Sequence, residues 1–347
     1  MKLGIGAVGF GPKVRINLDL IRHAETLGFD SAWTAEAYGN DAVTTATWVL
    51  ANTTRMKVGT AIMQIPARTP AMAAMTAMTL DQLSGGRFIL GLGPSGPQVI
   101  EGWHGVPYGK PLTRTREYIQ IIRQILAREK PLEFHGTHYD IPALGEGTTG
   151  LGKPLKSILH GDPSIPIYTA SISPPGLRCA GEVADGFFPM MLDPDRVDEV
   201  YLPHLEEGFA KAGGGKSLDN FAVIAGVSVI LSDEPEQART AVKGGMALYI
   251  GGMGARDKNF YNDLAKRLGY EEAAVKIQDL FLAGKKAEAT AAVPDELLDA
   301  VNLIGPKQRV RERLQAWKQA GDKKHVHTMM VSSPQPEALE LLAEELL

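Results

Sequence analysis

Two stretches of the sequence carry glycines at a spacing that can hold a phosphate. Residues 4–9 and 91–96 each read G-x-G-x-x-G. A dinucleotide site needs the last glycine at the start of a helix, because the N-terminus of that helix holds the pyrophosphate. The first match lies within its own predicted strand, and the second runs into Pro97 and a glycine-spaced loop before any helix. We therefore interpret both as strand ends, the second opening a flexible loop.

Other residues could do acid–base, metal or anion chemistry. Glu36 ends a predicted strand, where a carboxylate either caps the next helix or contacts a ligand. His325 and His327 lie on one face of a strand, but no third metal ligand accompanies them, so we interpret them as a structural pair and predict no metal site. Arg114 and Arg116 open a helix after the glycine-rich loop. They form either a solvated turn or an anion clamp, and the residue types leave both open.

These residues need a scaffold, and the sequence alternates short apolar runs with helical patterns. Repeated strand–helix units imply a parallel sheet with right-handed crossovers. Eight strands are predicted, over residues 2–8, 31–35, 56–63, 88–92, 165–170, 186–189, 221–231 and 325–331. This count favours one (β/α)8 TIM barrel over an open doubly wound sheet. We predict a single domain over residues 1–347, with insertions at about 131–164 and 241–301. The methionines between residues 63 and 78 are interpreted as core packing.

Composition narrows the class of protein. The chain has 347 residues, of which 44% are hydrophobic and 22% charged, and its formal net charge is -4. This balance supplies a large core and argues against a nucleic-acid binder. No apolar run reaches the roughly 18 residues that span a bilayer. The N-terminus lacks a signal pattern, and a lone cysteine, Cys179, excludes an internal disulfide. We expect a cytoplasmic protein with a small-molecule substrate, and neither a nucleic-acid nor a membrane partner.

Seven segments, spread in order along almost the whole chain, together match the sequence pattern of one known family. They are AETLGFD (24–30), WTAEAYGND (33–41), VGTAI (58–62), LDQLSGGRFILGLG (80–93), SGPQ (95–98), TRTREY (113–118) and ADG (184–186). Together they resemble the bacterial-luciferase-like superfamily of flavin and deazaflavin enzymes, in the branch of coenzyme F420-dependent oxidoreductases. The resemblance implies a luciferase-like (β/α)8 barrel with insertions, a homodimer, and a cofactor ring at the C-terminal mouth of the barrel.

The resemblance also implies positions for the cofactor. Glu36 falls where related enzymes place an acid near the ring, and Ala61-Ile62 falls where they carry a non-proline cis peptide. The turn of residues 170–173 matches the one whose backbone amides hold the phosphate. The residues predicted to bind the cofactor are Glu36, Ala61, Ile62, Gln64, Ser95, Gly96, Pro97, Gln98, Arg116, Ala170, Ser171, Ile172 and Ser173. Replacing Arg116 with alanine is then expected to weaken cofactor binding.

Two departures from the family pattern bear on the reaction. Ala37 follows Glu36 where F420-dependent glucose-6-phosphate dehydrogenase has a histidine, which argues against sugar-phosphate oxidation by that route. The phosphate turn continues as Ser-Pro-Pro rather than as a Gly-Gly-Pro type, although its hydroxyls could compensate. Glu36 and Tyr38 are the predicted catalytic residues. The predicted substrate contacts are Phe10, Trp103 and Tyr249.

The predicted function is hydride transfer between F420 and a small organic substrate, as reduction of an activated C=C, C=N or C=O bond. A deazaflavin passes two electrons as hydride, so the protein must mainly position the two reactants and exclude water. An FMN-dependent monooxygenase fed by a separate reductase is an alternative. A non-catalytic flavin-binding protein is an alternative from another class.

Overall fold

The apolar runs of the sequence form a closed ring of parallel strands in the computed structural model, which describes residues 1–7 and 11–347. Phe10, a predicted substrate contact, and Gly9 of the first glycine pattern therefore lie outside the described residues. Eight strands of the described chain make the ring, and β10 pairs with β9 to close it. In order around the ring they are β1 (Lys2–Gly6), β2 (Ser31–Thr34), β3 (Lys57–Thr60), β5 (Phe88–Gly93), β8 (Ile167–Ala170), β9 (Gly186–Phe188), β10 (Ala222–Leu231) and β12 (Thr328–Ser332). The predicted (β/α)8 barrel is confirmed.

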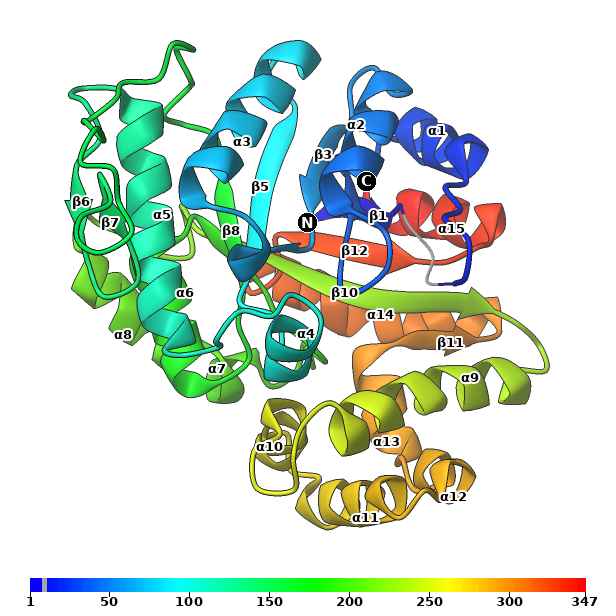
Figure 1. The fold of residues 1–347 in the computed structure, drawn as a ribbon. Coiled ribbons are helices and arrows are strands. Elements are labelled where there is room, and N and C mark those ends of the chain that lie inside the picture. The colour runs from blue at the N-terminus through cyan, green and yellow to red at the C-terminus, as the bar shows by residue number, and fades with distance from the viewer. Residues whose placement is uncertain (8–10) are drawn as a thin grey trace.

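Helices follow the strands and surround the ring (Figure 1). They are α1 (Leu18–Leu27), α2 (Ala42–Ala51), α3 (Pro70–Ser84), α5 (Pro111–Ala127), α6 (Pro174–Val183), α8 (Leu202–Ala212), α14 (Lys307–Asp322) and α15 (Pro336–Leu346). Short elements lie between them: β4 (Met63–Gln64), a 3-10 turn (Ile65–Ala67), α4 (Pro97–Gly102) and α7 (Val197–Val200). In the described part of the chain, no helix is both long and apolar enough to cross a bilayer.

Capping residues set the ends of the first helices. The Asn17 side chain accepts a hydrogen bond from the backbone N–H of Leu20, so α1 begins at Leu18. Gly28 ends α1 with φ of 97°, a left-handed conformation that suits glycine. Thr69 caps α3 in the same way as Asn17 caps α1. Asn17 and Thr69 therefore fix where two loops of the barrel mouth end, whereas Gly28 begins the turn into β2 at the opposite face.

One prediction about local structure is wrong, and another holds only in part. The loop expected after the second glycine pattern is the short helix α4, with Gly96 at its N-cap and Pro97 in its first turn, where proline is favoured. The expectation that the methionines of α3 pack in the core holds only in part. Met78 is fully buried, whereas Met72 and Met75 are each about half exposed on the outer face of the helix. The spacing did not reveal which face points outward.

The predicted insertions form two separate structures. Within 131–164, strands β6 (Phe134–His135) and β7 (Asp140–Ile141) make an antiparallel hairpin. The Glu117 carboxylate of α5 accepts hydrogen bonds from the backbone of Thr137 and His138, which attaches the hairpin to the barrel. The second insertion is a group of helices beneath the barrel in Figure 1. Its elements are α9 (Glu236–Ala247), the π-helical segment η2 (Leu248–Gly252), α10 (Phe260–Arg267), α11 (Glu271–Leu282), α12 (Lys286–Ala291), α13 (Asp295–Val301) and the strand β11 (Leu303–Gly305).

Strand β10 connects the barrel to this second insertion. Its first residues pair with β9, and its middle pairs with β12. Its last three residues, 229–231, pair in parallel with β11, the strand that brings the chain back from the insertion. The chain therefore leaves and re-enters the barrel through two hydrogen-bonded neighbours.

Glu25 of α1 gives the fold a testable dependence on pH. Its Oε1 accepts hydrogen bonds from the backbone N–H groups of Thr54, Arg55 and Met56, at 2.9, 2.6 and 2.8 Å. Burial alone would raise the pKa of Glu25, but these hydrogen bonds outweigh it and lower the pKa below its usual 4.5. A lowered carboxyl pKa stabilises the fold above the unfolded pKa, and this stabilisation is lost as the pH falls through the folded value.

We expect Glu25→Gln to lower the free energy of unfolding at neutral pH by about 1.5–3 kcal/mol, the range for hydrogen bonds to a charged group. The difference from wild type should shrink as the pH falls below about 4.5. Urea unfolding over a series of pH values measures both effects. A difference that is the same at neutral and acid pH would contradict the proposed role of the charge.

Candidate functional site

The carboxyl ends of the barrel strands meet around the indole of Trp33. Trp33 of β2 is 3% exposed, and it packs edge-on against Phe188 of β9 with ring centroids 5.3 Å apart. Three residues predicted to bind a cofactor, Ala61, Ile62 and Ala170, pack against this cluster and are partly exposed. The strand ends thus form an apolar floor that is partly open to solvent, which suits a flat ring system.

The segment after β3 is held between two neighbouring strands. The peptide bond between Ala61 and Ile62 is cis, as the resemblance predicted. The Ala61 N–H donates to the carbonyl oxygen of Thr34, and the Ile62 carbonyl accepts from the Glu36 N–H at 3.3 Å. On the other side, a Cβ at Gly93 would lie 2.8 Å from Ile62 Cγ1. The second glycine pattern therefore lets β5 approach this segment closely.

The Glu36 carboxylate accepts four hydrogen bonds. Oε1 accepts from the Gln64 N–H at 2.8 Å and from Arg68 Nη1 at 2.5 Å. Oε2 accepts from the Ala42 N–H and from Arg68 Nη2, each at 3.0 Å. The side chain is 6% exposed. A carboxylate has about four lone-pair positions, so these contacts use all of them.

This geometry favours a positioning role for Glu36 over the predicted catalytic one. A carboxylate that accepts from two backbone donors and a bidentate arginine has no free lone pair for a reacting group. The contacts fix the β2 loop and β4 at the mouth instead. Sequence reasoning missed Arg68, which also pairs with Asp41. The signal available was its place in the loop after the third strand, on the C-terminal face where the sites of barrels form.

Gln64 connects this ion pair to the loop after β5. Its side chain is buried, and its Nε2 donates to Ser95 Oγ at 2.8 Å. Its Oε1 lies 2.8 Å from His104 Nε2. The Tyr108 hydroxyl donates to the Ser95 carbonyl at 3.0 Å. The network brings together the predicted residues Gln64 and Ser95, and it adds the imidazole of His104.

The loop of residues 95–98 has a fixed shape. Ser95 adopts a positive φ of 58°, and Gly96 and Pro97 begin α4. The Gln98 Oε1 lies close to Gly96, 3.3 Å from where a Cβ would stand. Gln64 therefore holds this segment through Ser95, and the other three predicted residues follow directly in the chain.

Arg116 lies away from the Glu36 ion pair. Its Nε donates to Glu182 Oε2 at 2.8 Å, between α5 and α6 on the outside of the barrel. Burial opposes the charge, but the hydrogen bond to Glu182 raises the pKa of Arg116 on balance. The prediction that Arg116 binds an anionic cofactor conflicts with this placement, because its charge is already paired with a carboxylate.

We now expect Arg116→Ala to leave cofactor affinity within about twofold of wild type. Because the pair is partly exposed, its loss should lower the free energy of unfolding by no more than about 1 kcal/mol. Fluorescence titration with cofactor and urea unfolding measure the two quantities. A loss of affinity of about tenfold or more would return Arg116 to the site.

The predicted phosphate turn joins β8 to α6. Ala170 is the last residue of β8, and Ser173 caps α6 by accepting a hydrogen bond from the Gly176 N–H. The Ile172 carbonyl accepts a hydrogen bond from Arg267 of α10, which sequence reasoning did not single out. The turn therefore stands at a helix N-terminus and beside a cation from the second insertion, and both features favour an anion.

Tyrosines from three segments gather between the mouth and the second insertion. Tyr249 packs edge-on against Tyr261, with ring centroids 4.9 Å apart. Burial raises the pKa of Tyr249, and the neighbouring Tyr38 phenol adds to this effect. Burial, together with Tyr249 and Tyr108, raises the pKa of Tyr261 to about 12. The predicted Tyr38 and Tyr249 are thus brought near each other, whereas Trp103 is 67% exposed on the loop after α4.

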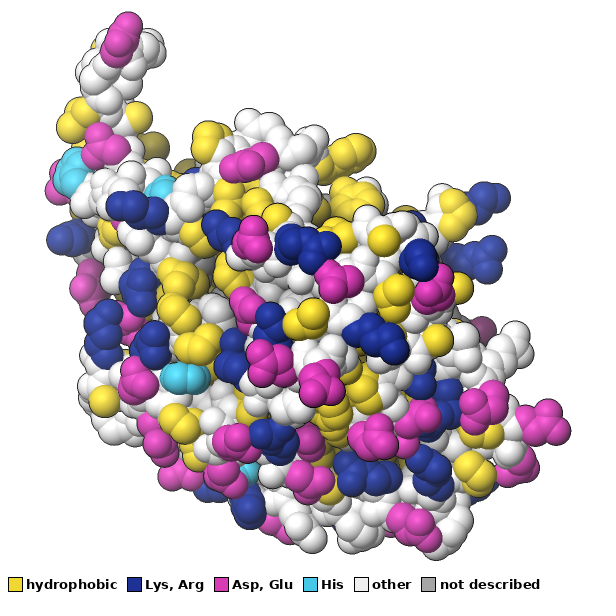
Figure 2. All heavy atoms as spheres, turned by 90° about the horizontal axis from the view of Figure 1, so that it is seen from below, with side chains coloured by type: hydrophobic (Ala, Val, Ile, Leu, Met, Phe, Trp, Pro, Cys, Tyr) yellow, Lys and Arg dark blue, Asp and Glu magenta, His cyan; other side chains and the backbone are white. Residues whose placement is uncertain are grey.

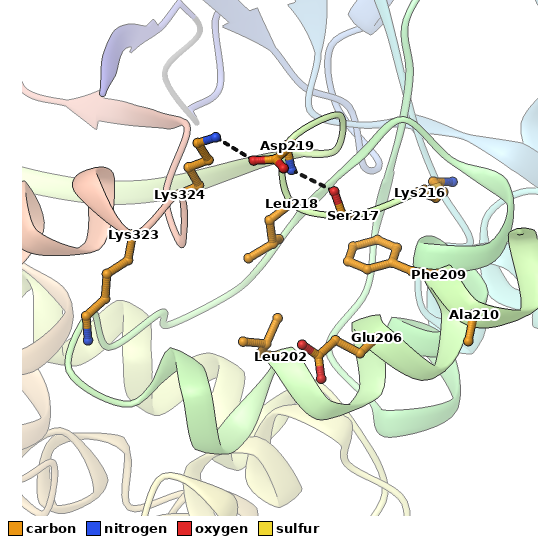
Figure 3. A pocket seen from close by; sticks show the side chains of 10 residues that line it. All are labelled: Leu202, Glu206, Phe209, Ala210, Lys216, Ser217, Leu218, Asp219, Lys323 and Lys324. Atoms are coloured by element: carbon orange, nitrogen blue, oxygen red, sulfur yellow. Dashed lines mark hydrogen bonds and ion pairs between the residues drawn. The ribbon is translucent and has the colours of Figure 1, made fainter. Parts of the chain in front are cut away.

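The cavity in Figure 3, of about 440 Å³, lies at the opposite end of the barrel. Its lining segments precede β10 and β12, so they stand at the N-terminal ends of the strands. Two of its lysines are already engaged, because Lys324 pairs with Asp219 and Lys216 donates to the Ala184 carbonyl. Barrel enzymes place their sites at the other face.

The two histidines before β12 make separate structural contacts. His325 Nε2 lies 3.2 Å from a carboxylate oxygen of Asp198, and burial lowers the pKa of His325. His327 Nδ1 accepts from the Val223 N–H, while its Nε2 contacts the Leu218 carbonyl at 2.9 Å. Across residues 1–7 and 11–347, no group of three or more His, Cys, Asp or Glu side chains could hold a metal ion.

The surface of the face that carries the second insertion has no excess of one sign of charge. In Figure 2, the face that carries the second insertion shows Lys and Arg side chains interspersed with Asp and Glu, and hydrophobic side chains between them. Such a mixed surface gives no field of one sign to attract an anionic ligand. Individual cations and backbone N–H groups at the mouth must provide that selection.

Comparison with known proteins agrees with this architecture. The luciferase-like monooxygenase family matches residues 3–324. A Mycobacterium tuberculosis protein, provisionally named a coenzyme F420-dependent oxidoreductase, is 44% identical over 345 residues, which cover 99% of this chain and 98% of that protein. The 5,10-methylenetetrahydromethanopterin reductase of Archaeoglobus fulgidus is 28% identical over 94% of this chain and 93% of its own length.

A solved structure shows the same fold. The coenzyme F420-dependent tetrahydromethanopterin reductase of Methanopyrus kandleri superposes with a TM-score of 0.76 at 26% identity, over 99% of this chain and 97% of its own. Because the family match spans most of the chain and the 44% identical relative spans nearly all of it, the chain belongs to the luciferase-like monooxygenase family.

Proposed function

We propose that this chain is an oxidoreductase that transfers a hydride between coenzyme F420 and a small organic substrate. One observation carries the proposal: the apolar floor of Ala61, Ile62 and Ala170 lies in the same barrel mouth as a turn rich in anion-binding features. The 44% identical relative is named for F420, and so is the reductase structure that superposes on this chain. The name of the family does not decide the reaction, since its members include F420-dependent reductases.

The residues present fit a deazaflavin with a phosphate on its side chain. The floor is apolar and partly open, as a ring requires, and the rigid network around Gln64 borders it. At the phosphate turn, Arg267 Nε is buried and has no hydrogen-bond acceptor among the described residues. An orphaned buried donor beside a helix N-terminus is the kind of feature that an anionic group would satisfy.

Bound F420 would supply the ring carbon that gives or accepts the hydride. The protein fixes the geometry around it: the Glu36–Arg68 pair holds the β2 loop against β4, and Gln64 holds Ser95. In this proposal the packed pair Tyr249 and Tyr261 of the second insertion would shield the reacting atoms from water. Among the described residues, we assign the movement of a proton at the substrate to the Tyr38 hydroxyl or to His104 Nδ1. The other ring nitrogen of His104, Nε2, is bound to Gln64.

Titration of the purified chain with F420 and with FMN, followed by fluorescence, tests the proposal. We expect micromolar binding of F420 and weaker binding of FMN. Binding of FMN without F420, joined to oxygen-dependent turnover of reduced FMN, would make the chain an FMN-dependent monooxygenase. F420 binding without reoxidation by any of a broad panel of activated alkenes, imines and carbonyls would instead indicate a non-catalytic flavin-binding protein.

We also propose that the chain acts in the cytoplasm as a homodimer. Three apolar side chains that are each about half exposed support a dimer: Trp48 of α2, and Met72 and Met75 of α3. Helices α2 and α3 contact each other, and exposed apolar residues on neighbouring helices are typical of an interface between subunits. Sedimentation equilibrium tests this part, and a species with the mass of one chain at micromolar concentration would contradict it.

A further inference from the structure

Arg267 differs from two other partly buried arginines, Arg68 and Arg116. Arg68 pairs with Glu36, and Arg116 pairs with Glu182. Arg267 has no carboxylate within salt-bridge distance in the described part of the chain. Its Nη2 donates to the Ile172 carbonyl, and its Nε is buried without an acceptor. The guanidinium therefore keeps an unused donor at the turn between β8 and α6.

The charge of Arg267 is poorly compensated. Burial lowers its pKa, and the opposing effects of Tyr201 and Asp263 do not cancel the lowering. Asp263 is one helical turn earlier on α10, outside hydrogen-bond distance of the guanidinium. A partly buried cation without an anion costs free energy unless an anionic partner arrives.

The turn itself presents donors without partners. Among the described residues, the backbone N–H groups of Ile172 and Ser173 have no acceptor, and the Ser171 hydroxyl makes no hydrogen bond. Pro174 and Pro175 occupy the first two positions of α6, and prolines have no N–H. The N-terminus of α6 thus lacks two of the donors that would ordinarily serve an anion there. The free N–H of the Arg267 guanidinium can replace a hydrogen-bond donor that the two prolines lack.

We propose that Arg267 binds the phosphate of the cofactor, together with the donors of residues 171–173. The inference rests on the proposed function and adds a residue from the second insertion to the site. Arginine suits this role because its planar fork matches the oxygens of a phosphate. Bound phosphate would then attach α10 to the barrel. Since α10 also carries Tyr261, which packs on Tyr249, the phosphate would hold the tyrosine wall of the substrate site in place.

The test compares two ligands that differ in the phosphate. The affinities of F420 and of its phosphate-free deazaflavin nucleoside are measured by fluorescence titration for wild type, Arg267→Ala and Arg267→Lys. We expect Arg267→Ala to weaken F420 binding by about ten- to a hundredfold and to leave nucleoside binding unchanged. Arg267→Lys should fall between, because it keeps the charge and loses the fork. Arg256→Ala, which removes an exposed arginine of the same insertion, is the matched control and should change neither affinity.

The outcomes separate the inference from the function on which it rests. Equal weakening of both ligands by Arg267→Ala would mean that the residue only supports the fold, and would overturn the inference. Unchanged F420 binding would overturn it as well, while leaving the proposed function intact. A wild-type protein that binds neither deazaflavin would overturn the proposed function and the inference together. Unchanged nucleoside binding in Arg267→Ala also shows that the variant is folded.

Discussion

Replacing Glu36 with glutamine is expected to lower the free energy of unfolding by about 3 kcal/mol. The amide would place an NH2 group where a carboxylate oxygen accepts two hydrogen bonds, so donors would face Arg68 and a backbone N–H. Removing one member of a buried ion pair leaves the other charge uncompensated. The loss stays near the lower end of the usual range because Asp41 still contacts Arg68. Urea unfolding followed by circular dichroism measures the change.

A control variant and a measurement of cofactor binding show whether the effect of Glu36→Gln comes from its ion pair. Glu129→Gln changes an exposed carboxylate after α5 and should alter the free energy of unfolding by less than about 0.5 kcal/mol. In Glu36→Gln, loss of stability should be accompanied by weaker cofactor binding, since the same ion pair shapes the mouth. A variant of normal stability and cofactor affinity whose turnover alone collapses would show that Glu36 is the proton donor after all.

Replacing Gly91 with alanine is expected to destabilise the barrel severely, although the change adds only one methyl group. An added Cβ would lie 1.7 Å from the backbone carbonyl oxygen of Thr60 and 2.9 Å from the ring of Phe188. A backbone oxygen in a central strand cannot move aside as a flexible side chain can. We therefore expect a loss of more than about 3 kcal/mol, seen as insoluble expression or a strongly lowered melting temperature.

Gly102→Ala is the matched control for this substitution. Gly102 is the last residue of α4, and a Cβ there would meet nothing within 4 Å. Alanine favours a helix over glycine by up to about 1 kcal/mol, so this variant should be as stable as wild type or slightly more stable. If Gly91→Ala melted at the wild-type temperature and lost only cofactor affinity, the glycine would serve a ligand rather than the approach of β5 to β3.

The barrel could be predicted because its signals are local. Apolar runs alternate with helical periodicity, and residues such as Gly28 end helices through their own backbone conformation. The misplaced elements also have local causes. Pro97 was interpreted as part of a loop although it favours the first turn of a helix, which is what it begins in α4. The outer and inner faces of α3 could not be separated, since its apolar residues lie all around the helix.

The site was harder to predict because its contacts join distant residues. The sequence marks Glu36 as a carboxylate at a strand end, but its partner Arg68 lies 32 residues away and shares no local pattern with it. Arg116 was chosen as the cation because it follows the glycine-rich loop. Its actual partner, Glu182, lies on the next barrel helix, and no spacing within either helix could reveal that pairing. Residues 61–62 and 170 were located by resemblance rather than by physical pattern.

The pairing of β11 with the end of β10 also bears on whether the segment between them can be exchanged between related enzymes. The whole segment of residues 232–302 begins and ends at two strands that are hydrogen-bonded to each other. Its two attachment points are therefore adjacent and fixed, whatever lies between them. Such a segment can be exchanged as a cassette without altering the register of the barrel. Chimeras that join the barrel of this chain to the corresponding segment of a relative, cut after Leu231 and before Leu303, would test whether this segment determines substrate preference.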